Sequence, residues 1–90
     1  MSYTYYENWR RESLRVLKEA QSSKTSLEAL MQKSKVEERE LLTRLEEVSR
    51  SISNAEGLHK RYKYPDALKL SREALAALKE LHYLVLASRE

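Results

Sequence analysis

The segment GLHKRYKYP, residues 57–65, contains the only glycine and the only proline of this 90-residue chain. Inside a helix, glycine costs about 1 kcal/mol and proline about 3 kcal/mol relative to alanine. Neither residue occurs from Tyr5 to Glu56, where helix-favouring Leu, Glu, Lys, Arg and Ala are frequent. The sequence therefore predicts an all-α protein with one marked break at this segment.

A second break is predicted where the apolar pattern of the preceding helix changes phase. At 100° per residue along that stripe, Val36 falls on the polar side and Glu38 on the apolar side. Ser34 and Glu37 have the spacing of a capping box, in which the two residues satisfy backbone N–H groups at a helix start. We therefore predict a turn at about residues 33–35.

The two breaks predict a single helical domain over residues 1–90. We expect an antiparallel three-helix bundle with helices at about 5–33, 35–57 and 65–88. The alternative is one unbroken helix over residues 5–56, which would form a long helical hairpin or a coiled-coil dimer. Such a helix would be too long for the third helix to cover, so it would need a second chain.

The third helix carries more apolar surface than one neighbour can cover. Pro65 suits the first helical position, and Asp66 suits the positive end of the helix dipole. One apolar stripe follows at helical spacing, and Leu68, Leu75 and Leu86 form a second stripe about 100° away from it. The second stripe is predicted to pack on another helix or on a partner protein.

The sequence offers little for enzymatic chemistry. It has no cysteine, and no glycine-rich phosphate loop can be built from one glycine. The spacing of Glu56 and His59 matches half of a helical di-metal site, but no second pair exists, so we expect a solvent-exposed His59. His82 is expected at the edge of the apolar stripe. We predict no enzymatic activity, no catalytic residue, no metal and no cofactor.

Aromatic residues gather near the N-terminus, where Tyr5, Tyr6 and Trp9 lie close together. Tyr and Trp are frequent at the energetic centres of protein interfaces, because they bury a large area with few rotamers. The same residues could simply seal one end of the bundle. We predict partner-binding roles for these three residues together with the second stripe of the third helix.

The segment 59–64 alternates cations with tyrosines. Lys60, Arg61 and Lys63 could contact phosphates, and the tyrosines between them could stack on bases. The chain has 17 Lys and Arg against 14 Asp and Glu, and the formal net charge is +3. Because these charges are interspersed, the sequence favours solvated helix faces and disfavours nucleic acid as the main partner.

These observations predict a non-enzymatic helical module for protein–protein interaction, acting as a subunit, an adaptor or a chaperone-like partner in a homo- or hetero-oligomer. A nucleic-acid-binding accessory protein and a self-associating structural coiled coil are the two alternatives. No apolar run approaches the roughly 20 residues that a membrane span needs, and no signal peptide is visible. We therefore expect a cytoplasmic protein.

Overall fold

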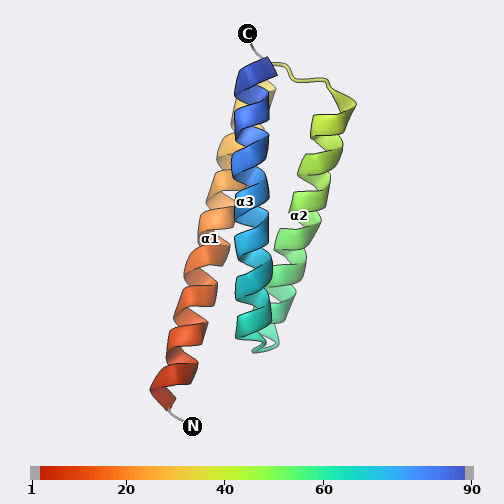
Figure 1. Cartoon of the computed structure of the whole chain (residues 1–90). Helices are drawn as coiled ribbons and strands as arrows, with labels where there is room; N and C mark the ends of the chain where they lie inside the picture. Colours follow the sequence, from red (N-terminus) through yellow and green to blue (C-terminus); the bar gives the residue numbers. More distant parts are fainter. Residues whose placement is uncertain (1–2, 89–90) are drawn as a thin grey trace.

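The protein is a bundle of three α-helices that pack side by side along a rod (Figure 1). The computed structural model describes residues 3–88, with side chains from Tyr6 onward. The helices are α1 (Tyr3–Lys33), α2 (Arg39–Lys60) and α3 (Tyr64–Ser88). The principal extents of the rod are 52 × 17 × 15 Å. The prediction of an all-α three-helix bundle is confirmed, and an unbroken helix over residues 5–56 is wrong.

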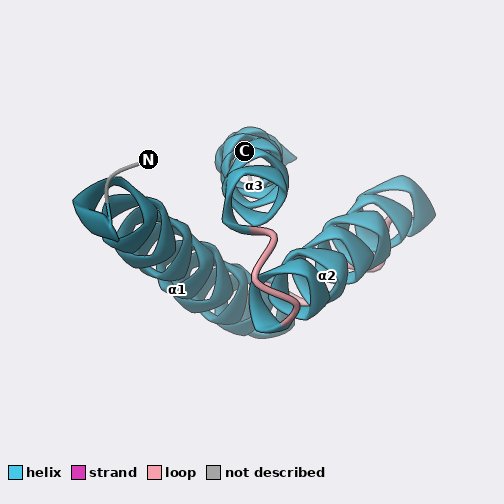
Figure 2. Cartoon of the chain, turned by 90° about the horizontal axis from the view of Figure 1, so that it is seen from below, coloured by secondary structure: helices cyan, strands magenta, loops and turns pink. Residues whose placement is uncertain are grey.

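Helix α3 packs against both other helices, whereas α1 and α2 contact each other much less (Figure 2). Consecutive helices are antiparallel, so α1 and α3 both begin at the end of the rod where α2 finishes, which we call the basal end (Figure 1). The apolar core is contributed by all three helices: Val16, Leu17, Ala20, Leu27, Met31, Leu41, Val48, Ile52, Ala55, Tyr64, Ala67, Leu68, Ala74, Leu78, Leu81 and Val85.

The break between α1 and α2 is a Schellman motif, a hydrogen-bonded reversal at a helix C-terminus. The backbone N–H of Val36 donates to the carbonyl of Met31 (3.0 Å), and the N–H of Lys35 donates to Gln32 (3.2 Å). Lys35 has a positive φ of 52°, and Val36 packs against the core. This arrangement satisfies carbonyls at the end of α1 and turns the chain away from the helix axis.

The predicted position of this turn is correct, but the predicted cause is wrong. α2 begins at Arg39, its N-cap residue Glu38 makes no side-chain capping bond, and the Ser34 hydroxyl has no hydrogen-bond partner. A capping box of Ser34 and Glu37 is therefore absent. The apparent phase slip at Val36 reflects its position just after the left-handed residue, where it folds back onto α1.

A second Schellman motif ends α2 at the basal end. Lys63 N–H donates to Leu58 (2.9 Å), Tyr62 N–H donates to His59 (3.1 Å), and Tyr62 has a φ of 67°. Gly57, expected to break the helix, lies inside α2, where an added Cβ would meet nothing within 4 Å. The second helix therefore extends three residues beyond its predicted end, and α3 begins one residue before Pro65.

Replacing Lys35 by glycine should raise the free energy of unfolding by about 1 kcal/mol, since a left-handed conformation costs an L-residue roughly that amount. Lys35 is exposed, so little packing is lost. The matched control is Lys18→Gly, at an exposed position inside α1, which should lower stability by about 1 kcal/mol. Urea denaturation followed by circular dichroism measures both, and an equal loss in both variants would contradict the prediction.

Candidate partner-binding site

A polar and aromatic cluster joins all three helices near the basal end. The Ser13 hydroxyl of α1 lies 3.0 Å from Nδ1 of His59 in α2. The His59 ring lies 5.0 Å from the ring of Tyr64, the first residue of α3. Ser13 is completely buried and His59 is half-buried. His59 is therefore less exposed than predicted, because its ring contacts Ser13 of α1 and Tyr64 of α3.

The electrostatics of this cluster favour the neutral imidazole. Burial lowers the pKa of His59 below its ordinary value of 6.5, and the positive charge of Arg10 lowers it further. Burial raises the pKa of Tyr64, and a hydrogen bond with Tyr6 contributes in the same direction. Since Ser13 has no exposed surface, its hydroxyl cannot meet a substrate in this conformation. The pair therefore ties α1 to α2.

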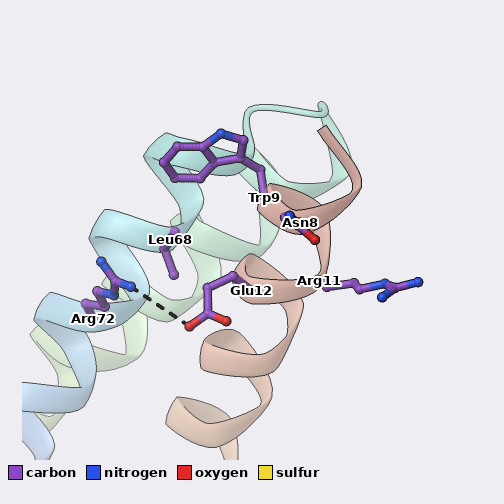
Figure 3. A pocket seen from close by; sticks show the side chains of 6 residues that line it. All are labelled: Asn8, Trp9, Arg11, Glu12, Leu68 and Arg72. Atoms are coloured by element: carbon purple, nitrogen blue, oxygen red, sulfur yellow. Dashed lines mark ion pairs between the residues drawn. The ribbon is translucent and has the colours of Figure 1, made fainter. Parts of the chain in front are cut away.

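Next to this cluster, a hollow of about 530 Å³ opens between α1 and α3. Figure 3 shows the Trp9 ring extending from α1 across one side of the hollow, with Leu68 of α3 below it. Glu12 and Arg72 face each other at the other side, at 3.9 Å. We call this feature the α1/α3 groove; its lining consists of Asn8, Trp9, Arg11, Glu12, Leu68 and Arg72.

The charged side of the groove is fixed by a small ion-pair network. Glu12 pairs with Arg15 on α1 as well as with Arg72 on α3. The hydrogen bond from Arg15 lowers the pKa of Glu12, and the charge of Arg72 acts in the same direction. Arg11, in contrast, points away from the bundle (Figure 3). The groove thus combines an apolar floor and wall with an anion and a cation at one rim.

The predicted contact residues take different places in this arrangement. Trp9 is half-buried and Leu68 is only 4% exposed, so most of the Leu68 side chain belongs to the bundle and the rest forms the groove floor. Leu75 is half-buried, whereas Leu86 is 43% exposed. The side chain of Tyr5 lies outside the described residues. The predicted stripe is therefore partly core and partly open surface.

The other predicted residues also cluster in space. Tyr6 is exposed and packs its ring edgewise against Tyr64, with ring centroids 5.3 Å apart. Lys60, Arg61 and Lys63 are exposed at the junction of α2 and α3, at the same end of the rod as Tyr6.

Sequence reasoning missed the polar lining of the groove, because exposed charges such as Glu12 and Arg72 carry no periodic signal. It also missed the Ser13–His59 contact, although Ser13 lies on the apolar stripe of α1.

A smaller hollow of about 330 Å³ lies on the other side of α3, between α2 and α3. Arg44 and Glu80 approach within 3.7 Å across it, and Val48 and Leu81, which also line it, are buried in the core. Unlike the α1/α3 groove, which Trp9 lines, this smaller hollow has no aromatic residue in its lining. The α1/α3 groove is therefore the better candidate for a binding site.

Comparisons with known proteins identify no matching family, no similar curated protein and no similar solved structure. Within residues 3–88, none of the helices combines the length and hydropathy that crossing a bilayer requires.

Protonation of His59 should destabilise the bundle as the pH falls below about 6.5. Because its pKa is lowered by folding, the unfolded chain binds the proton at a higher pH than the folded chain, so stability is lost on acidification. Arg10 on α1 and Tyr64 on α3 are the neighbouring charged or titratable groups. Denaturation between about pH 7.5 and pH 5.5 should show this loss for the wild-type protein and a smaller one for His59→Gln. The control His82→Gln removes an exposed imidazole and should keep the wild-type dependence.

Proposed function

We propose that this protein is a non-enzymatic helical interaction module, a subunit or adaptor that receives a helix of a partner protein along the α1/α3 groove. The observation that carries the proposal is the hollow in which Trp9 and Leu68 meet. These residues are 59 positions apart in the sequence, and both belong to the set that composition and periodicity marked as partner contacts. A cytoplasmic location is part of the same proposal.

The apolar character of the groove extends along α3. Leu75 follows Leu68 by seven residues, or about two turns, and Leu86 follows it by 18 residues, which is five turns at 3.6 residues per turn. All three leucines therefore lie on one side of α3. Their exposure rises from Leu68 at the basal end to Leu86 at the opposite end. A partner helix laid along this line would cover surface that the bundle leaves open.

The charge pattern along the groove limits the chemistry of the partner. Arg72 and Lys79 are exposed and seven residues apart, so they lie two turns apart on the same side of α3. An amphipathic helix with carboxylates at matching spacing would pair with Lys79 and share Arg72 with Glu12, while its apolar face covers Trp9 and Leu86. Burying the exposed part of Leu86 contributes about 1 kcal/mol, and the aromatic ring of Trp9 adds to this. Helix-in-groove binding of this kind is a recurrent mode of recognition.

Two equally exposed leucines distinguish binding at the groove from nonspecific hydrophobic association. Leu86, at 43% exposure, lies on the proposed surface, and Leu42, at 42%, lies on α2. Leu86→Glu should abolish partner capture from the native source by placing a charge in the interface, whereas Leu42→Glu should retain it. Affinity capture with quantitative mass spectrometry measures both, and circular dichroism should show equal helicity in the two variants.

Loss of the same partners from both leucine variants, or from neither, would contradict a docking role for the groove. Light scattering of the isolated protein at about 10 µM tests self-association at the same time. A dimer that Leu86→Glu dissociates would identify a second copy of the chain as the occupant of the groove.

A further inference from the structure

The basal end of the rod gathers cations from two segments that are distant in the sequence. Arg10 comes from α1, and Lys60, Arg61 and Lys63 come from the junction of α2 and α3. The proximity is supported by the charge of Arg10, which acts on both His59 and Tyr64. Sequence reasoning disfavoured nucleic acid because the cations looked dispersed, but the fold brings these four together.

Two of these cations are available to a ligand. In the described part of the chain, Arg61 and Lys63 are exposed and form no ion pair. Lys60 pairs with Glu56 at 3.4 Å, and Arg10 pairs with Glu7 at 2.9 Å. Asp66, exposed in the first turn of α3, is a further carboxylate nearby in the sequence. The four cations thus outnumber the three carboxylates, and the two unpaired cations lie on either side of Tyr62.

The helix directions add to the positive potential at this end. α1 and α3 both begin here, whereas only α2 ends here. Each helix start carries roughly half a positive charge and each helix end roughly half a negative charge. The backbone therefore favours an anion at the basal end in addition to the side chains.

Aromatic rings lie among these cations. Tyr62 is 70% exposed, and its ring is perpendicular to that of Tyr64 with centroids 6.3 Å apart. Tyr6 packs against the same Tyr64 ring from α1 and is itself exposed. The buried Tyr64 thus supports two solvent-facing tyrosines, one from each segment. Alternation of exposed rings and cations is the arrangement that binds bases and phosphates of single strands.

From this arrangement we propose that the basal end binds single-stranded nucleic acid. Arg61 and Lys63 neutralise phosphates, Lys60 and Arg10 extend the positive surface, and bases stack on Tyr62 and Tyr6. The exposed rings distinguish this ligand from a simple polyanion, which would need the cations alone. The surface borders the α1/α3 groove near Trp9, but it lies far from Leu86, which is near the opposite end of α3, so a variant at Leu86 separates this proposal from partner-helix binding.

The backbone at Tyr62 provides a test in which folding and binding change in opposite directions. Its φ of 67° is the left-handed conformation that glycine adopts without strain and that a bulky residue adopts at a cost. Tyr62→Gly should therefore fold at least as stably as the wild-type protein while removing the exposed ring. Loss of binding in this variant could not be attributed to unfolding.

The probe is a fluorescein-labelled oligonucleotide of roughly 12 residues, as single-stranded RNA and as DNA, followed by fluorescence anisotropy at low salt. Tyr62→Gly should weaken binding about 5- to 150-fold, the effect of losing one stacked base. The matched control is Tyr83→Ala, which removes an equally exposed tyrosine (72%) far along α3 and should leave the affinity unchanged. Thermal denaturation should show no loss of stability for Tyr62→Gly.

The salt dependence tests the cations separately. Arg61→Gln with Lys63→Gln should lower the slope of log affinity against log salt by about 1.4, since each phosphate contact with a single strand contributes about 0.7. Lys33→Gln with Lys35→Gln removes the same charge at the opposite end of the rod and should leave the slope unchanged.

The proposal is overturned if neither oligonucleotide binds at low salt. It is also overturned if Tyr62→Gly binds as well as the wild-type protein while inorganic polyphosphate competes fully, because the site would then be a nonspecific anion surface. Binding to vesicles of anionic phospholipid without binding to the oligonucleotides would likewise refute it. Leu86→Glu should retain oligonucleotide binding, so oligonucleotide binding and partner-helix binding at the groove are tested separately.

Discussion

The bundle depends on the packing of α3 against both other helices. α1 and α2 contact each other sparsely, so each is held mainly through α3. The buried side of α3 alternates small and large residues near its start, where Ala67 and Ser71 lie beside the buried Leu68. Small side chains allow neighbouring helices to approach closely, and the rings of His59 and Tyr64 lie at that same end. Both candidate binding surfaces border α3, the groove at Leu68 and Arg72 and the basal end at Lys63, which directly precedes the helix.

The helices were predictable because apolar residues recur at helical spacing along each segment, and this local signal needs no knowledge of tertiary contacts. The turn after α1 was placed correctly from the phase change at Val36, yet its cause was not recognised. Schellman motifs are normally read from a glycine, and here Lys35 and Tyr62 occupy the left-handed positions. Gly57 was expected to break the second helix, yet it lies inside α2. A helix held by tertiary contacts tolerates a glycine near its end.

Less of the candidate site was predictable, because it arises from contacts between helices. Periodicity identified the stripe of Leu68, Leu75 and Leu86, but it could not show that Leu68 is buried while Leu86 stays exposed. Composition identified the aromatic and basic segments separately. Their meeting at one end follows from the direction of three consecutive helices, and the Ser13–His59 contact follows from the same arrangement.

The odd number of helices has a consequence for whatever this protein joins together. Tyr3 and Ser88 lie at opposite ends of a rod 52 Å long (Figure 1). A bundle of two or four consecutive antiparallel helices would place both chain termini at the same end. Here, neighbours attached to the two ends would be held apart by the full length of the bundle, so the module would act as a stiff spacer that fixes their separation.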